Sequence, residues 1–561
     1  MFLKTIEEKG KINFKSDFID YSYLAGMKRL FMDFLGGESP AINYYKWNFR
    51  SVNDYFELAD RLSSIEFPRQ RLAEILWEDN CKIECASKIR DNIDKFSDPD
   101  SLVVIAGQQV GIFGGPLLTF YKAVGVVKLA AQLSKRLSKP VVPIFWMATE
   151  DHDYEEANSI YLVNSKGERI KIYNEPGDNQ LGKSMSQIKL GEGIKKAISE
   201  LQNNLLHTEY TDSLFGRISK YYKPGNKISE AFAGWVSELL RDYGLILLDP
   251  SNAEFKELAV PIYEKEIRGG YDTEVPNDKR QGDGLIADGY HLQVQKFKKG
   301  LNLFYADKYR ERILLAAEEK GFILDRSQKK IDEARLVQLL YDTPEKFSSG
   351  VLLRPIVQSK LLPTVCFIGG ASEIAYHSQL PPYYEYFNVI PPIIRPRPSV
   401  SLMGKRIRSI VDKYGMDIRL LFNDPHRVVN EVLIKYFPAG LEGKLNHLQM
   451  EVLDLLASIS PELRNYDDGL RRTFASSVRK VETELNKLRA KIFQAHKKKN
   501  AEITGQILRA YDSFFPNGVM QERVLPMIYF LNKYSPSFAD RLAEEIDIDR
   551  FQHQIISILP E

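Results

Sequence analysis

The chain of 561 residues is longer than one ordinary hydrophobic core, so about two to four domains are expected. Its apolar content of 44% and charged content of 27% are typical of globular proteins, and a net charge of +2 gives no reason to expect nucleic acid or an anionic membrane as a partner. No apolar segment approaches the roughly 20 residues that span a bilayer, and the first residues hold no signal-peptide core. We therefore expect a cytoplasmic protein.

Residues 1 to about 95 have a mostly helical pattern with scattered aromatic residues. Cys81 and Cys85 lie four positions apart on an expected helix without a second matching pair, so helix packing is favoured over zinc binding. With Cys366 there are three cysteines, which cannot form a disulfide framework.

An α/β core is predicted to begin near Leu102. The apolar runs Leu102–Ala106 and Val141–Met147, separated by a helical pattern, are typical of buried parallel strands in a βαβ unit. The segment GQQVGIFGGP follows the first strand, and Glu150-Asp151-His152-Asp153 follows the second. Ligands of open α/β sheets bind at the carboxyl ends of the strands, so both segments are expected to face one crevice.

The rest of the core is interrupted by two polar, turn-rich stretches that we interpret as insertions. A further strand is predicted at Leu245–Pro250, two apolar strands within 347–370, and a last strand at Asn388–Ile394. The predicted domains are 1–160 (helices and first half of the core), 161–235 (first insertion), 236–270 (an αβ unit), 271–345 (second insertion), 346–425 (second half of the core), 426–510 (helical hairpin) and 511–561 (a segment that returns to the core).

The hairpin is predicted from a change of hydrophobic period. Two apolar series recur with a mean spacing of 3.5 residues, which is the seam of a coiled coil. They are Leu441, Leu445, Leu448, Val452, Leu455 and Ile459, and then Phe474, Val478, Val481, Leu485, Leu488 and Ile492. We expect two antiparallel helices that project from the core.

The glycine-rich loop matches neither the P-loop nor the dinucleotide fingerprint. Its glycines allow a ligand to approach the backbone closely, and the following helix N-terminus favours phosphate or carboxylate. Lys122, about two turns into that helix, could reach such an anion. The alternative is a tight strand-to-helix turn with Lys122 in solvent.

The acidic segment after the second strand carries more specific chemistry. His152, between carboxylates, is suited to acid or base catalysis near neutral pH. The carboxylates could bind Mg²⁺ together with ATP phosphates, or a substrate ammonium group. The alternative is an acid-rich helix N-terminus, which the helix dipole favours.

Further candidates lie in the second half of the core. Ser349, Arg354 and Gln358 are placed at a strand edge, where an arginine is suited to carboxylate or phosphate. Gly369-Gly370 opens a helix and forms another candidate anion site, with Glu373 in its first turn. The remaining histidines show no metal-ligand spacing, so no protein-bound metal site is predicted.

At these residues the chain resembles the cysteine-adding ligases of bacillithiol biosynthesis, the BshC family. The resemblance rests on AGQQVGIFGGPLLTFYKA, PIFWMATEDHDYEE, FSSGVLLRPIVQSKLLPTVCFIGGASEIAY and, more weakly, FPNGVMQERVLP. It implies a Rossmann-like core with two connecting-peptide insertions, a long antiparallel α-helical coiled-coil domain, and a homodimer.

The resemblance also implies an activity, which is to join the carboxylate of cysteine to the amine of glucosaminyl malate, with ATP or ADP as the nucleotide. The expected catalytic residues are His152, Asp151, Asp153 and Gln109. The expected substrate-binding or nucleotide-binding residues are Gln108, Gly111, Gly114, Gly115, Lys122, Glu150, Ser349, Arg354, Gln358, Gly369, Gly370, Glu373, Tyr376 and Arg395.

Two other functions stay open at this point. One is a different synthetase-like ligase or nucleotidyltransferase on the same core. The other is a non-catalytic assembly protein in which the coiled coil is the working part. A fold alone does not choose between them.

Overall fold

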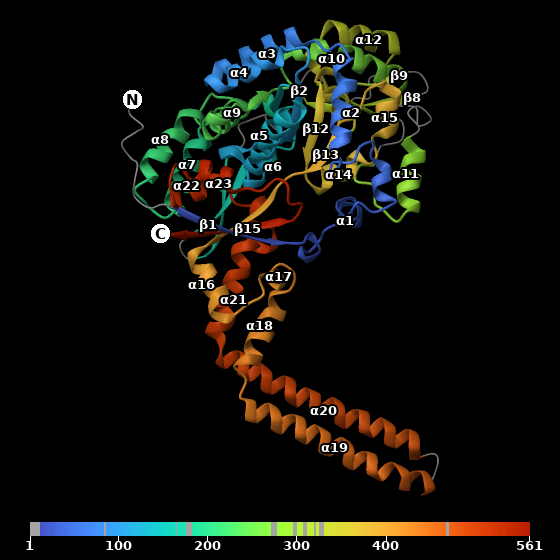
Figure 1. The fold of residues 1–561 in the computed structure, drawn as a ribbon, viewed down its shortest axis with the longest axis vertical. Coiled ribbons are helices and arrows are strands. Elements are labelled where there is room, and N and C mark those ends of the chain that lie inside the picture. The colour runs from blue at the N-terminus through green and yellow to red at the C-terminus, as the bar shows by residue number, and fades with distance from the viewer. Residues whose placement is uncertain are drawn as a thin grey trace.

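The computed structural model describes residues 12–83, 86–164, 167–175, 182–270, 278–295, 300–306, 311–318, 321–324, 330–466 and 470–560, so Cys85 lies outside the described residues. Figure 1 shows an α/β body from which a pair of long helices projects at one end. Within the described part of the chain, no helix is long and apolar enough to cross a membrane.

A five-stranded sheet forms the centre of the body. Its order is β13 (Ile393–Pro396), β12 (Thr364–Gly369), β2 (Leu102–Gln108), β3 (Val141–Met147) and β6 (Ile246–Leu248). All four pairings are parallel. The strands are almost wholly buried because helices cover both faces, which explains their uninterrupted apolar sequences. The predicted Rossmann-like core is confirmed.

Neighbouring side chains of β12 show which helices cover each face of the sheet. Cys366 faces Tyr55 of α2 (Val52–Ser63), whereas Phe367 packs on His377 of α14 (Ala371–His377). Because successive side chains of a strand point to opposite faces, α2 and α14 lie on opposite sides of the sheet. The other covering helices include α3 (Arg69–Ile83), α4 (Ser87–Phe96), α5 (Leu117–Leu137), α9 (Ile228–Leu239) and α10 (Ala253–Lys265).

The two polar stretches of the core carry small structures of their own. The first holds the antiparallel hairpin of β4 (Ser159–Val163) and β5 (Arg169–Tyr173), followed by α7 (Gly193–Asn204) and α8 (Thr211–Tyr221). The second contributes most of an antiparallel sheet of order β10 (Lys330–Ile331), β9 (Gly321–Ile323), β8 (Arg312–Glu318), β7 (Gly300–Ala306) and β11 (Phe347–Ser349). Strand β11 connects this second sheet to the core.

Two strand predictions in the second half of the core are wrong. The segment Arg354–Leu361, expected near a strand edge, is the helix α13. Its residues are nearly all buried, so the apolar run shows no helical amphipathic period, and Pro355 stands in the first turn, where proline is tolerated. The last strand is also shorter than predicted, since β13 covers only Ile393–Pro396.

The helical assignment of the first residues misses a strand. Strand β1 (Ile12–Ile19) pairs antiparallel with the final strand β15 (His553–Pro560), which pairs in turn with β14 (Ser399–Gly404). The two ends of the chain therefore meet in one small sheet, beside the body (Figure 1). The last segment ends in this sheet, between β1 and β14.

The projecting domain is the antiparallel hairpin of α19 (Ala439–Tyr466) and α20 (Leu470–Lys499) (Figure 1). Arg489, near the end of α20, lies 3.6 Å from Glu442 at the start of α19, as antiparallel helices require. The hairpin stands on a stalk of shorter helices, which are α16 (Lys405–Tyr414), α17 (Ile418–Leu421), α18 (Pro425–Lys435) and α21 (Ala501–Phe514). The predicted coiled-coil domain is confirmed.

Candidate active site

The candidate site lies where the central strands end. Strands β2 and β3 run in parallel register, with Gln108 beside Met147, and β12 ends at Gly369 on the other side of β2. Because parallel strands share one carboxyl edge, the glycine loop, the segment 150–153 and Gly369-Gly370 all emerge at this edge.

The glycine loop is folded tightly against the protein. Phe113, Gly114 and Gly115 all have positive φ, and a Cβ at Gly114 would approach Trp235 Cδ1 to 2.8 Å. The amide of Gly114 donates to the hydroxyl of Tyr222 at 3.0 Å. These contacts explain why the segment needs glycine.

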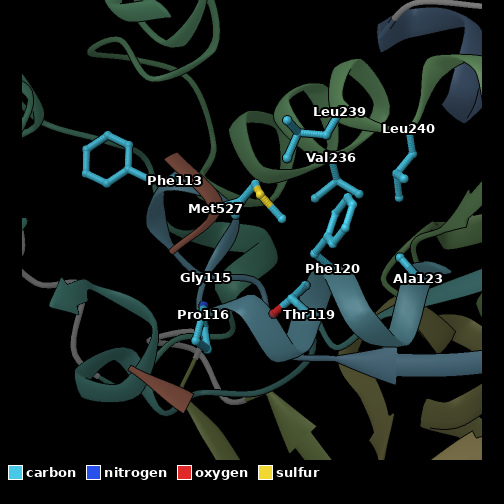
Figure 2. Close-up of a pocket in the computed structure, with 11 residues that line it drawn as sticks. Phe113, Gly115, Pro116, Thr119, Phe120, Ala123, Val236, Leu239, Leu240 and Met527 are labelled. Atoms are coloured by element: carbon cyan, nitrogen blue, oxygen red, sulfur yellow. The ribbon is translucent and has the colours of Figure 1, made fainter. Parts of the chain in front are cut away.

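The back of this loop is an apolar packing surface. Figure 2 shows Phe120, Val236 and Met527 gathered around the start of α5, where they enclose a void of only about 10 Å³. Such a void holds at most one water molecule. The first turn of α5 is also occupied, since Leu117 N donates to Leu525 O at 2.8 Å and Pro116 has no N–H. Phosphate binding by Gly111, Gly114 and Gly115 stays a prediction. The amides of Gly114 and Leu117 already donate hydrogen bonds to other residues of the protein.

Lys122 is buried and links two strand ends. Its ammonium donates to Gly107 O at 2.7 Å and to Gln108 Oε1 at 2.9 Å, and it lies 2.5 Å from Glu373 Oε2. The same carboxylate oxygen accepts from the amide of Gly370 at 2.8 Å. Burial lowers the pKa of Lys122, and the charge of Glu373 opposes this shift. Lys122 therefore joins β2 to the start of α14, and it is not the solvent-exposed lysine of the simpler interpretation.

Glu150 turns inward and pairs with Lys256 of α10. Both side chains are almost inaccessible to solvent, and the ammonium of Lys256 also donates to Phe347 O at 2.7 Å. The hydroxyl of Ser349 donates to Glu150 Oε2 at 3.5 Å. This buried pair joins β3, α10 and β11 beneath the site.

Asp151, His152 and Asp153 form the loop that follows β3. The side chain of His152 is 45% exposed, and its Nδ1 lies 3.8 Å from Asp151 Oδ1. Asp151 Oδ1 also accepts the amide of His152 at 2.7 Å, while Asp153 caps the short helix α6 (Tyr154–Ala157) through the amide of Glu156. Gln109 Nε2 donates to Asp153 O at 3.0 Å, so the glycine loop and this loop are in contact. His152 is the member of this group that presents a titratable ring to solvent.

Arg354 and Arg312 lie on the other side of this edge. Arg354, at the start of α13, donates to the hydroxyl of Tyr376 at 2.9 Å. Arg312, from β8, donates to Ser349 O at 2.7 Å, and its Cζ lies 3.9 Å from the ring centroid of Phe304. Burial lowers the pKa of Arg312 to about 10, and Asp151 opposes this shift.

The charges of these segments act on one another. Burial alone would lower the pKa of both Arg312 and Arg354, and the charge of Asp151 opposes this effect at both arginines. The charge of Glu373 also raises the pKa of Arg354, which lies above its ordinary value. The residues contributed by β3, β8, α13 and α14 therefore surround one region. It combines arginine side chains with carboxylates, a combination that can bind a carboxylate or phosphate next to an ammonium group.

Gln358 and Arg395 have other surroundings. The amide nitrogen of Gln358 is buried and has no hydrogen-bond partner among the residues that the structure describes. Arg395 donates to Ile548 O and to Asp549 Oδ1, both at 2.8 Å, and so fixes the C-terminal segment to β13. A contact of Arg395 with a substrate anion stays a prediction, since its guanidinium is bonded to the C-terminal segment.

Sequence reasoning missed four charged residues of this region. Lys256 and Arg312 lie outside the motifs, and no local pattern marks them. Arg397 and Glu522 form a buried bidentate pair, at 3.0 and 2.5 Å, that fixes the motif FPNGVMQERVLP against β14.

The next residue of that motif, Arg523, keeps solvent access, but partial burial and the charge of Arg397 lower its pKa, a shift that the charges of Glu373 and Glu156 oppose. No ion pair of Arg523 is found within the described ranges. In the sequence, Glu522 and Arg523 within this motif were the signal that could have pointed to this segment.

The site shows no preformed metal centre. Across the described residues, no three His, Cys, Asp or Glu side chains form a group that could hold a metal ion. Mg²⁺ that enters with a nucleotide needs only one or two carboxylates.

Two family models cover nearly the whole chain. The model described as "Bacillithiol biosynthesis BshC, N-terminal Rossmann-like domain" matches residues 14–398, and the model described as "Bacillithiol biosynthesis BshC, C-terminal coiled-coil domain" matches residues 400–558. Both descriptions agree with the architecture seen here.

Similar full-length proteins carry the name "Putative cysteine ligase BshC". The protein of Salinibacter ruber is 28% identical over 95% of this chain and 97% of its own length. That of Chlorobaculum tepidum is 30% identical over 94% and 96%, and that of Bacillus licheniformis is 26% identical over 94% and 97%. The chain belongs to the BshC family of bacillithiol biosynthesis, whose members are named as cysteine ligases.

Proposed function

We propose that this protein joins the carboxylate of cysteine to the amine of glucosaminyl malate, with a nucleotide that activates the carboxylate. The observation that carries the proposal is the set of arginines and carboxylates around the carboxyl edge of the central sheet, next to the exposed imidazole of His152. Both substrates carry carboxylates and amines, which are the groups that such a set can bind.

The residues of the site have distinct proposed roles. Arg312 and Arg354 bind the carboxylate of a substrate or the phosphates of ATP, and Arg523 adds a third cation at the same edge. Asp151 receives the ammonium group of cysteine. Bound ATP would supply the activation that turns a carboxylate oxygen into a leaving group.

His152 has the proposed role of general base. The attacking amine must lose a proton as the C–N bond forms, and an exposed imidazole can accept that proton at neutral pH. Asp151, with its carboxylate 3.8 Å from Nδ1, orients the ring. Gln109 helps to hold the loop, since it contacts the carbonyl of Asp153.

Product analysis tests this proposal. Purified protein is incubated with cysteine, glucosaminyl malate and Mg-ATP, and the mixture is examined by mass spectrometry. A new species with the mass of the amide, absent for His152→Ala and strongly reduced for Gln109→Ala, supports the ligase and its site. An amide formed with another amino acid but not with cysteine would favour a different ligase on the same core.

We also propose that the protein is a homodimer that associates through the hairpin. On α19, Leu441, Leu448 and Leu455 recur every seven residues and are 38%, 41% and 66% exposed, and Leu488 of α20 is 46% exposed. An apolar stripe of this kind on a projecting helix fits a second copy of the same hairpin. Light scattering tests this, because Leu448→Glu with Leu455→Glu should give a monomer, whereas an unchanged dimer would exclude this surface.

A further inference from the structure

A second cavity, of about 360 Å³, lies away from the residues assigned to the ligase reaction. It is enclosed by the segment 44–47, helix α15 (Pro381–Phe387) and the chain just before β13. Its volume falls in the lower part of the range of about 300 to 1,000 Å³ that is usual for small-molecule sites.

The aromatic residues of this cavity are held rigidly by the protein. Tyr45 donates from its hydroxyl to Ile374 O at 2.8 Å, and Trp47 donates from Nε1 to Pro391 O at 2.8 Å. The hydroxyl of Tyr44 donates to Asp288 at 2.5 Å. Because their polar ends are engaged, these side chains offer apolar ring surface to the cavity.

One buried polar atom in the lining has no partner. His377 is 3% exposed, and its Nε2 has no hydrogen-bond partner among the described residues, whereas the hydroxyl of Tyr384 faces Ser359, which does not line the cavity. Burial lowers the pKa of His377 to about 3, so its ring is neutral at pH 7. A buried polar atom without a partner costs about 1–3 kcal/mol, which a ligand with a matching group would relieve.

The exposed rim of the cavity carries both signs of charge. Lys46 and Glu385 are exposed lining residues, and neither forms an ion pair within the described part of the chain. Arg61 also lies at the rim, but it pairs with Glu57 at 2.7 Å. The rim therefore offers one ammonium and one carboxylate that are not paired.

We propose that this cavity binds a free amino acid with a polar aromatic ring, namely tyrosine or tryptophan. The ring stacks among the aromatic side chains, and its hydroxyl or N–H bonds to His377 at the buried end. The carboxylate of the ligand meets Lys46, and its ammonium meets Glu385. This proposal does not depend on the proposed ligase activity.

Binding to the full-length protein tests the proposal, by isothermal titration calorimetry and saturation-transfer NMR. The probes are L-tyrosine, L-tryptophan and L-phenylalanine, with tyramine as the analogue that lacks the carboxylate. Because one hydrogen bond is worth about 1 kcal/mol, phenylalanine and tyramine should each bind about fivefold more weakly than tyrosine.

Two variants locate the site. His377→Phe keeps an aromatic ring while removing both ring nitrogens, and it should weaken tyrosine binding at least fivefold while leaving phenylalanine binding unchanged. Lys46→Met removes the ammonium at the rim and should weaken the binding of tyrosine and of phenylalanine alike. Tyr341→Phe, which changes a 56% exposed tyrosine outside the cavity, is the matched control. Thermal unfolding verifies that each variant is folded.

Three results would overturn the proposal. They are no saturable binding of tyrosine or tryptophan at millimolar concentration, equal affinity for tyrosine and phenylalanine, or tyrosine binding that neither variant weakens. The first result would mean that the cavity holds only water. If His377→Phe fails to fold, Lys46→Met and the comparison of tyrosine with phenylalanine decide the question.

Discussion

Replacement of Lys122 by methionine separates a structural role from a ligand-binding role. Methionine keeps the apolar part of the side chain and removes the ammonium group that contacts Gly107 O, Gln108 Oε1 and Glu373 Oε2. If these contacts are what Lys122 is for, the variant loses stability. If Lys122 binds a substrate anion, the variant loses affinity for that substrate and keeps its stability.

The structure allows the size of the loss to be worked out. Hydrogen bonds from a charged group are worth about 1.5–3 kcal/mol each, but burying the ammonium offsets part of this gain. Removing one partner of a buried ion pair costs about 3–5 kcal/mol. Glu373 retains 19% side-chain exposure and can recruit water, so we expect the lower end, about 3 kcal/mol.

Urea unfolding at pH 7 measures this loss for Lys122→Met, for Glu373→Gln and for the double variant. A direct contact predicts that the double variant loses clearly less than the sum of the single losses. Lys135→Met, on an exposed position of the same helix, is the control and should change stability little. A Lys122→Met protein with wild-type stability and a raised KM for ATP would refute the reasoning.

Three further predictions concern the site and its support. His152→Ala should lower turnover about 10²- to 10⁴-fold without lowering the thermal midpoint, because the ring is half-exposed. Near-full turnover of this variant in the mass-spectrometric assay would show that His152 is not the general base. Glu155→Ala is the neighbouring control. Arg523→Ala should raise KM for an anionic substrate more than it lowers kcat, in steady-state kinetics, and an unchanged KM would place this exposed guanidinium outside the binding site. Glu522→Gln should cost about 3–5 kcal/mol at pH 7 because it leaves Arg397 buried without its partner. Burial alone would raise the pKa of Glu522, but Arg397 holds that pKa below its ordinary value, so this stabilisation is present above the unfolded pKa of about 4.3 and is lost as pH falls. The difference in urea unfolding between wild type and Glu522→Gln should therefore shrink below about pH 4, and a constant difference would contradict the linkage.

The parts of the fold that were predicted correctly are those with a local cause. Strands β2, β3 and β6 are short apolar runs bounded by turns, and the hairpin has a repeating apolar period. Helix α13 was missed because six of its eight residues are buried, so its apolar positions show no helical period. Strands β1 and β15 were missed because their pairing joins the two ends of the chain, and no local pattern reports a partner that distant.

In the candidate site, too, the local sequence predicts some features, whereas others depend on distant segments. The sequence places Glu150 and Asp151 side by side after a buried strand, and both were expected to serve the chemistry. In the structure Glu150 turns into the protein and pairs with Lys256, whereas Asp151 faces the site. The side chains of residues 150 and 151 point in different directions because they are neighbours in the chain. The partner that neutralises Glu150, Lys256, is supplied by α10. The same distinction applies to arginine, since Arg395 is engaged by the C-terminal segment while Arg354 faces Tyr376 and Glu373. A strand end rich in charge therefore predicts where a site lies, but the candidates for binding a substrate are the charges that distant segments do not neutralise, here Asp151, His152, Arg312, Arg354 and Arg523.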